Sequence, residues 1–419
     1  MSPAASLLRI ALVSLHTSPG DEPGSGDAGG MNVVVRQQAE AMAAAGHTVD
    51  ILTRRSSPTL PDAVVLAPRL TLRFLQAGPV APISKGAHEA VIDEFRVRLA
   101  ALGDYDVIHS HHWFSGMAAL PLAQGRGIPH VQSFHSIAAD PSTPLSAGER
   151  PESPGRMRGE AWLARESDAL VAISNAEADT IVTRLGGSPE RIFVVLPGVD
   201  ADLFHPAPGI RATGPGYAIV AARLQPLKGL DLAVEAIAAV PTVLRPELII
   251  AGDASGDFDG YIDGLRELAD RNGVADNVRF LGPQTRTALA ALFRDAKVVL
   301  IPSHSETFGL VALEAAASGV PVVASASGGL REAVLDGDTG IVLASRDPQA
   351  WGAAITTLLG DADLARRLSV DARARAERLD WPRSARALLD VYRGLLEPCS
   401  ADEADGADAY DDRHRLRIA

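Results

Sequence analysis

Short β-rich apolar segments alternate with longer Ala- and Leu-rich segments along most of the chain. In the first half, RIALVSL (residues 9–15) is followed by VVVRQQAEAMAAAG (33–46) and HTVDILTR (47–54). The same alternation runs through DYDVIHSHH (104–112) and IPHVQSFHS (128–136). Strands that alternate with helices form parallel sheets with helices on both faces. The pattern therefore predicts an α/β chain with a doubly wound, Rossmann-like topology.

The alternation breaks at residues 199–216, which are rich in Pro and Gly and lack periodicity, so we predict a linker there. It restarts with YAIVAARL (217–224) and continues through KVVLIPS (297–303). A length of 419 residues suits two domains of roughly 100–200 residues each, and their facing sheet edges should form one cleft. We expect four parts in this order: an N-terminal domain (1–200), a C-terminal domain (201–380), a helix that crosses back to the first domain (381–397) and a disordered polar tail (398–419).

Charge and cysteine content exclude several classes of protein. Lys and Arg number 39 against 52 Asp and Glu, which gives a net charge of −13 and argues against nucleic-acid or anionic-membrane partners. No apolar run approaches the ~20 residues of a membrane span, and Arg9 interrupts the first one, so it reads as a strand. The single cysteine, Cys399, excludes an internal disulfide and a cysteine-based zinc site. We expect a cytoplasmic protein.

The glycines Gly24, Gly26 and Gly29 spell the GxGxxG pattern of dinucleotide-binding proteins. That motif needs a tight turn directly from strand to helix, whereas here the first strand should end near Leu15, far before Gly24. We therefore reject a nicotinamide or flavin site. The alternative is a glycine-rich loop that opens a helix, where backbone N–H groups favour an anion.

A second set of polar residues follows the strands of the second half. Arg223 and Lys228 come just after YAIVAA, where a guanidinium fork and an ammonium group can hold a diphosphate. Glu306 and Glu314 flank Gly309, near which a helix should begin. Two carboxylates beside a bound anion suit sugar and ribose hydroxyl groups. The alternative is ordinary surface charge, with a glutamate favoured by the helix dipole.

Histidines cluster in the first half at His109, His111, His112 and His135. Alternation along a strand places His109 and His111 on one face. Zinc binding is disfavoured because no carboxylate lies at ligand spacing. His135 should lie at a strand edge, where it suits a hydrogen bond to a ligand hydroxyl or to developing positive charge, while His109 suits a structural role.

Four motifs in this order resemble the retaining glycosyltransferases of the GT-B fold, family 4. They are GGMNV (29–33), HSHHW (109–113), RLQPLKG (223–229) and the Glu306-x7-Glu314 pair. The resemblance covers residues 7–397. Within the family, the motifs most resemble those of the inositol-phosphate glycosyltransferases of mycothiol synthesis. Sucrose synthase and sucrose-phosphate synthase have a similar glycine-containing opening.

The resemblance implies roles for individual residues. Those at the reaction centre are His135, Arg223, Lys228 and Glu306. Those that bind the nucleotide-sugar donor are Gly30, Arg223, Lys228, Glu306, Phe308, Gly309 and Glu314. Those that bind the acceptor are Asn32, Lys85, His112, Ser136 and Arg156. No metal ligand is implied.

The resemblance further implies transfer of a hexosyl unit, GlcNAc or glucose, from a UDP-sugar to a small polar acceptor without a protein nucleophile. No cofactor would be required, and Mg²⁺ and a homodimer are left open. Lys85 matches the lysine that holds the acceptor phosphate in the inositol-phosphate pattern. His112 and Ser136 replace a tyrosine and a threonine of that pattern, but both can still donate a hydrogen bond to a phosphate oxygen. We therefore predict a phosphorylated acceptor and a His112 that gains charge near pH ~6.5. The alternatives are a sucrose-type synthase, a secondary-metabolite glycosyltransferase, and a non-catalytic two-domain binding protein.

Overall fold

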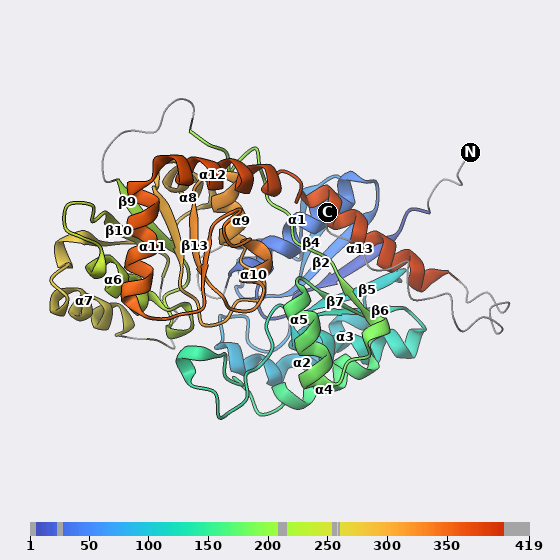
Figure 1. Cartoon of the computed structure of the whole chain (residues 1–419). Helices are drawn as coiled ribbons and strands as arrows, with labels where there is room; N and C mark the ends of the chain where they lie inside the picture. The colour runs from blue at the N-terminus through green and yellow to red at the C-terminus, as the bar shows by residue number, and fades with distance from the viewer. Residues whose placement is uncertain (1–5, 23–27, 208–215, 254–257, 259, 398–419) are drawn as a thin grey trace, which may run out of the picture.

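The computed structural model describes residues 6–22, 28–207, 216–253, 258 and 260–397. Within these residues the chain forms two α/β units, each built on its own sheet (Figure 1). The predicted polar tail (398–419), the centre of the predicted linker (208–215), and both Gly24 and Gly26 lie outside the described residues. None of the described helices is long and apolar enough to span a membrane.

The first unit contains an eight-stranded sheet in the order β3-β4-β2-β1-β5-β6-β7-β8. Its strands are β1 (Arg9–Val13), β2 (Thr48–Arg54), β3 (Ala63–Ala67), β4 (Leu70–Leu75), β5 (Val107–His111), β6 (His130–Ser133), β7 (Ala169–Ala172) and β8 (Ile192–Val194). All pairs are parallel except β3 with β4, which form an antiparallel hairpin at the sheet edge. This antiparallel pair was not predicted from the alternation of strands and helices; a short turn at Arg69 (φ 64°) reverses the chain there.

Helices cover both faces of this sheet. Residues of α1 (Gly30–Ala44) and α13 (Trp381–Leu396) pack on one face, and residues of α2 (Ile92–Ala100), α3 (Trp113–Arg126) and α4 (Arg156–Glu166) pack on the other. A shorter helix, α5 (Asn175–Thr180), follows β7. Residues 14–29 separate β1 from α1, so the tight strand-to-helix turn of a dinucleotide motif is not formed.

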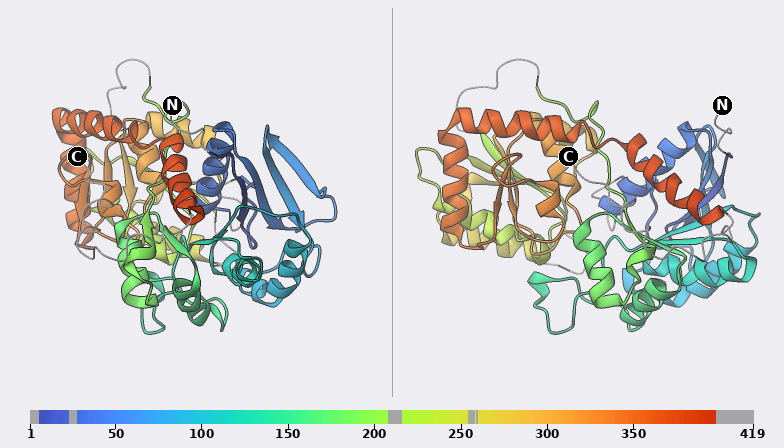
Figure 2. Two further views of the ribbon diagram at one scale, coloured as in Figure 1. Left: turned by 90° about the vertical axis from the view of Figure 1, so that its right-hand side faces the viewer. Right: turned by 45° about the vertical axis from the view of Figure 1, so that its right-hand side comes forward.

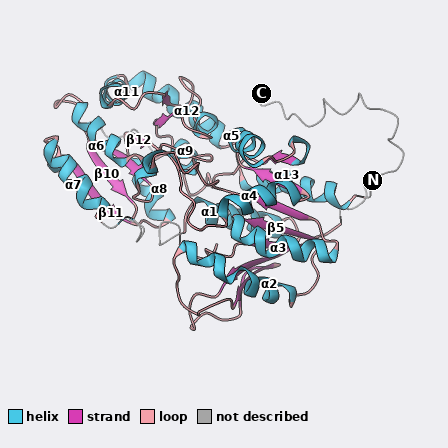
Figure 3. Ribbon diagram, turned by 90° about the horizontal axis from the view of Figure 1, so that it is seen from below, coloured by secondary structure: helices cyan, strands magenta, loops and turns pink. Residues whose placement is uncertain are grey.

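The second unit contains a six-stranded, wholly parallel sheet in the order β11-β10-β9-β12-β13-β14. Its strands are β9 (Tyr217–Ala221), β10 (Glu247–Ala251), β11 (Val278–Gly282), β12 (Val298–Ile301), β13 (Val322–Ser325) and β14 (Ile341–Leu343). Residues of α6 (Leu230–Ala239), α7 (Tyr261–Arg271) and α11 (Pro348–Gly360) pack on one face; residues of α8 (Arg286–Asp295), α9 (Leu310–Ala317) and α12 (Ala362–Ala376) pack on the other. A short helix, α10 (Leu330–Ala333), follows β13. Figure 3 shows the two sheets from below with helices around each.

The chain passes between the two units at two neighbouring points. The first crossing follows β8, and the second comes between α12 and α13, where the Val199 N–H donates to Leu379 O at 2.7 Å. The α13 helix then lies along α1 of the first unit (Figure 2), and Gln38 Nε2 donates to Ser384 Oγ at 3.0 Å between them. An Asp380 side chain that accepts from Arg383 N caps the start of α13.

Candidate functional site

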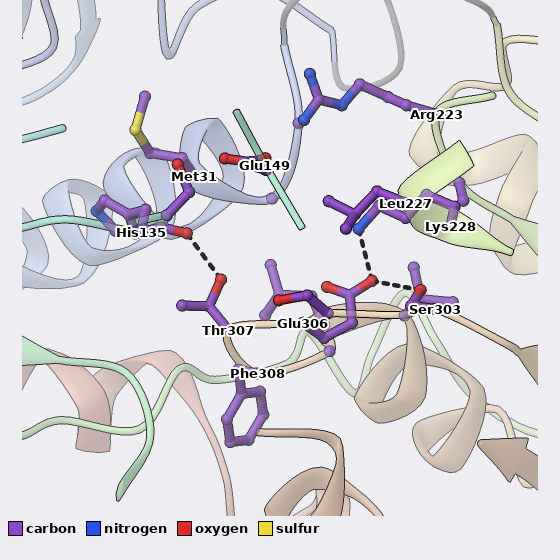
Figure 4. A pocket seen from close by; sticks show the side chains of 18 of the residues that line it. Met31, His135, Glu149, Arg223, Leu227, Lys228, Ser303, Glu306, Thr307 and Phe308 are labelled. Carbon is purple, nitrogen blue, oxygen red and sulfur yellow. Dashed lines mark hydrogen bonds and ion pairs between the residues drawn. The ribbon is translucent and has the colours of Figure 1, made fainter. Parts of the chain in front are cut away.

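One cavity of about 720 Å³ lies where loops after the strands of both units meet (Figure 4). Its walls contain twelve of the thirteen residues predicted from the sequence: Gly30, Asn32, Lys85, His112, His135, Ser136, Arg223, Lys228, Glu306, Phe308, Gly309 and Glu314. Arg156 is the exception, since it does not line the cavity. Ligands of open α/β sheets bind at the carboxyl ends of the strands, which is where this cavity lies.

Lys228 lies in the loop after β9, at the end of a short 3₁₀ turn (Pro226–Lys228). Its Nζ is 2.6 Å from Glu306 Oε1, which also accepts a hydrogen bond from Ser303 Oγ at 2.9 Å (Figure 4). Gly229 follows with φ 64°, and a Cβ there would lie 2.2 Å from Pro302 O. Only glycine lets the loop turn so close to the β12 loop, so the local sequence holds the Lys228 amine over the Glu306 carboxylate.

The α9 helix begins at the cavity wall. Gly309 precedes it with φ 108°, and a Cβ there would lie 2.5 Å from Leu330 Cδ2. Phe308 is 1% exposed and packs in the core of the second unit, so only its backbone is available to a ligand. The helix start presents unpaired backbone N–H groups to the cavity, which favours an anion there.

Glu314 lies on α9, about one turn after the helix begins at Leu310. Its Oε1 is 3.0 Å from Arg286 Nη1, and burial raises the pKa of Glu314 to about 6 against the pull of Arg286. Sequence reasoning missed Arg286, which also lines the cavity. Like Arg223, Arg286 lies shortly after a strand, here β11, at the sheet edge, so the same pattern in the sequence could have identified it.

The start of α1 forms another part of the wall. Asn32 Nδ2 donates to Thr17 Oγ1 at 2.9 Å and to Ser18 O at 2.6 Å. The amide of Asn32 therefore holds the loop after β1 in place. Asn32 also lines the cavity, and its contact with the acceptor stays a prediction. Gly30 leaves room for the other unit: a Cβ there would lie 3.3 Å from Leu310 Cδ1.

His135 has a strained backbone (φ 58°) just after β6 and is held from two sides. Its Nε2 is 2.8 Å from His111 Nδ1, and its carbonyl oxygen accepts a hydrogen bond from Thr307 Oγ1 of the other unit at 2.7 Å (Figure 4). Burial lowers the pKa of His135 to about 4. The imidazole is therefore neutral at physiological pH and can offer one nitrogen as a donor or an acceptor.

His109 has a structural role, as the sequence suggested. Its Nδ1 is 2.7 Å from the Tyr392 hydroxyl of α13, and its Nε2 is 2.9 Å from Ser133 Oγ. Both ring nitrogens are thus satisfied. Across the described part of the chain, no group of three or more His, Cys, Asp or Glu side chains is placed to hold a metal ion.

Charged side chains gather at the end of the cavity formed by the first unit. Lys85 Nζ is 2.7 Å from Glu152 Oε1. Arg156 is fully buried; its Nε is 2.9 Å from Glu160 Oε1, and its Nη2 donates to Ser136 Oγ at 3.0 Å. Arg156 is not among the residues that line the cavity and lies behind Ser136, so its contact with the acceptor stays a prediction.

Glu149 is a cavity residue that sequence reasoning missed. Its Oε2 is 3.6 Å from Arg156 Nη2. Burial alone would raise the pKa of Glu149, but Lys85 and Arg156 outweigh it and lower the pKa to about 2. No motif marks Glu149, since its place depends on the path of the loop after β6.

His112 stacks near His16, with ring centroids 4.3 Å apart. Burial holds the pKa of His112 well below 6.5, and His16, Arg156 and Lys85 lower it further. The prediction that His112 gains charge near pH 6.5 is therefore wrong. His112 would meet a ligand as a neutral imidazole.

Comparison with known proteins gives the family. The pattern described as "Glycosyltransferase Family 4" matches residues 28–203, and that described as "Glycosyl transferases group 1" matches residues 205–375. A D-inositol 3-phosphate glycosyltransferase of Stackebrandtia nassauensis is 40% identical over 408 residues, which cover 93% of this chain and 92% of that protein. This chain belongs to glycosyltransferase family 4. A second relative of this glycosyltransferase is a D-inositol 3-phosphate glycosyltransferase of Streptomyces coelicolor. It is 37% identical, and the match covers 93% of this chain and 92% of the relative.

Solved structures place this glycosyltransferase in the GT-B fold. Sucrose-phosphate synthase of Thermosynechococcus elongatus superimposes with a TM-score of 0.84 at 30% identity and covers 93% of this chain and 99% of its own. Anabaena HepE, solved in complex with UDP and glucose, gives a TM-score of 0.72 at 19% identity over 92% of this chain and all of its own. The fold and the transferase class predicted from the motifs are confirmed, and the non-catalytic alternative is ruled out.

Proposed function

We propose that this glycosyltransferase moves a hexosyl unit, GlcNAc or glucose, from a UDP-sugar to a hydroxyl group of a small phosphorylated acceptor such as inositol phosphate. One observation carries the proposal. Lys228 and Glu306 of the second unit open onto the same cavity as Lys85 and Ser136 of the first. The names of the relatives support the choice of acceptor.

The ion pairs in the cavity suggest how the donor binds. A diphosphate beside Arg223 would draw the Lys228 amine away from Glu306 and add the amide groups at the start of α9. The released Glu306 carboxylate would then accept hydrogen bonds from sugar hydroxyls. Glu314 is ionised beside Arg286 at neutral pH and would accept from the ribose hydroxyls.

The reaction needs no enzyme-bound intermediate. The acceptor oxygen forms a bond to the anomeric carbon on the face from which the diphosphate leaves, and the bond between that carbon and the phosphate oxygen breaks. The acceptor proton passes to the leaving phosphate, so UDP and a glycoside of retained configuration result. Arg223, Lys228 and the α9 start stabilise the charge on the leaving group, so we propose that no cofactor is required.

A sucrose-type synthase is the second candidate, favoured by the 30% identity to sucrose-phosphate synthase. The two candidates share a donor site and differ in the acceptor. Inositol phosphate carries its phosphate on a ring without an anomeric centre, whereas fructose 6-phosphate is a reducing sugar. An assay with both acceptors distinguishes the two candidates.

A donor-by-acceptor activity matrix tests the proposal. UDP-GlcNAc, UDP-glucose and their ADP counterparts are each combined with inositol 3-phosphate, inositol, fructose 6-phosphate and an aminocyclitol, and nucleotide release is measured. We expect the highest rate with a UDP-sugar and inositol phosphate, and slow UDP release without acceptor. A preference for fructose 6-phosphate would establish the second candidate, and a preference for an unphosphorylated acceptor would contradict both.

A further inference from the structure

A carboxylate lies among positive charges at the end of the cavity formed by the first unit. Glu149 lies on the cavity wall (Figure 4) with its Oε2 3.6 Å from Arg156 Nη2, and this nitrogen also donates to Ser136 Oγ at 3.0 Å. The positive charges of Lys85 and Arg156 outweigh burial and hold the pKa of Glu149 at about 2. This place in the cavity stabilises a negative charge strongly, even out of water.

The same positive charges also lower the pKa values of two neighbouring histidines. Burial lowers the pKa of His16 well below 6.5, and the positive charges of Lys85, Arg156 and Arg223 lower it further. Burial lowers the pKa of His112 as well, and His16, Arg156 and Lys85 lower it further. A site that opposes charge on two imidazoles and favours it on a carboxylate is a site for anions.

Glu149 leaves several hydrogen-bond donors of this anion site without a partner in the described part of the chain. Arg156 Nη1 and both ring nitrogens of His112 are buried and have no hydrogen-bond partner among the residues that the structure describes, and Glu149 Oε2 likewise makes no hydrogen bond. A neutral imidazole offers one N–H, so at least two donors remain unmet. A phosphate monoester has three terminal oxygens and up to two charges, so it can meet more of these donors than a carboxylate can.

We propose that Glu149 occupies, in the empty enzyme, the position that the acceptor's phosphate takes in the complex. The proposal rests on the proposed function, in that the acceptor carries a phosphate. The carboxylate offsets the charge of Arg156 before the acceptor binds, and it must turn away before the phosphate can bind. Glu149 thereby determines how tightly phosphorylated acceptors bind, without touching the sugar that is transferred.

Glu149→Gln tests this role because it keeps the shape of the side chain and removes its charge. We expect the KM for inositol 3-phosphate to fall about fivefold, since the phosphate no longer competes with a carboxylate. The KM for the donor should stay within about twofold of the wild type, because Glu149 lies at the end of the cavity formed by the first unit. Glu166→Gln removes the same charge from the exposed far end of α4 and should change none of these values.

A binding measurement separates this role from the proposed function. Titration calorimetry with inorganic phosphate, in the presence of UDP, should show binding about fivefold tighter to Glu149→Gln than to the wild type. If no acceptor is turned over while phosphate still binds the variant more tightly, the proposed function fails and the role of Glu149 stands. A higher KM for inositol phosphate in the variant, or weaker phosphate binding, overturns the role.

A second variant covers the case in which Glu149→Gln does not fold. Glu149→Asp draws the carboxylate back by one methylene group and keeps its charge, so phosphate binding should tighten in the same direction but less. Unchanged or weaker phosphate binding by this variant would overturn the inference.

Discussion

Lys228 and Glu306 show how single residues in this cavity depend on one another. In the empty protein the two are paired at 2.6 Å, although the sequence assigned one to the diphosphate and the other to the sugar. The pair lets both charges sit in a partly buried wall, because each side chain satisfies the other until a ligand replaces it. The same arrangement recurs at Glu314 and Arg286.

Sequence reasoning found the residues that follow strands and missed those that depend on loop paths. Arg223 and Lys228 were found because a cation after a β-rich run lies at the ligand edge of a parallel sheet. Glu149 and Glu152 lie in a long segment between β6 and α4 that has no periodicity, so nothing in their local sequence places them beside Lys85. The neutral state of His112 likewise follows from burial that only the fold reveals.

A buried glutamate beside the cavity makes a prediction about stability. Burial raises the pKa of Glu177 from 4.5 to about 7, and its Oε2 accepts from the Ile173 N–H at 2.8 Å. The folded state therefore holds this proton at pH values where the unfolded state has lost it. The stability associated with it is full below pH ~4.5 and is lost as pH rises through ~7.

Glu177→Gln should remove this dependence. Between pH 5 and 7.5, the free energy of unfolding of the wild type should fall by about 2 kcal/mol relative to that of the variant. Urea denaturation of both proteins across this range measures the difference. Parallel stability curves for the two proteins would show that Glu177 does not titrate in this way.

At the scale of elements, the β-branched runs and Ala-rich segments predicted most strands and helices because buried parallel strands read as continuous apolar runs. The antiparallel β3–β4 hairpin was missed, since its exposed residues, such as Val65 at 75% exposure, do not alternate cleanly. The late helix was predicted to cross back to the first unit. In the structure, α13 lies along α1, and its Tyr392 hydroxyl is 2.7 Å from Nδ1 of His109 in β5.

The packing of α13 makes the second stability prediction. Leu388 is fully buried with side chains of α1 and the first sheet, so Leu388→Ala should destabilise the protein by about 3 kcal/mol through the cavity it leaves. Val370 on α12 is 61% exposed, so Val370→Ala is the matched control and should change stability by less than ~0.5 kcal/mol. Chemical denaturation measures both. Equal effects of the two substitutions would mean that α13 contributes little to the first unit.

At the scale of the whole molecule, the two units meet through a few polar contacts around the cavity. Ser174 Oγ donates to Thr307 O at 2.6 Å, and Thr307 Oγ1 donates to His135 O at 2.7 Å. Glu332 accepts from the backbone N–H groups of Asn175 at 2.9 Å and of Ala176 at 3.0 Å. Thr307 directly follows Glu306, so the contact that joins the units also positions the carboxylate assigned to the donor sugar. Such pairings between units lie beyond what a single sequence predicts.

The central claim is that one cavity between the units carries out retaining transfer from a nucleotide diphosphate sugar. The most direct test follows a mixture of UDP-GlcNAc, inositol 3-phosphate and enzyme by proton NMR, with Arg223→Ala/Lys228→Ala as the control. We predict UDP release that depends on the acceptor, a product with the α-anomeric coupling of the donor, and a rate at least ~100-fold lower in the double variant. A product of inverted configuration, or wild-type turnover by the double variant, would contradict the account.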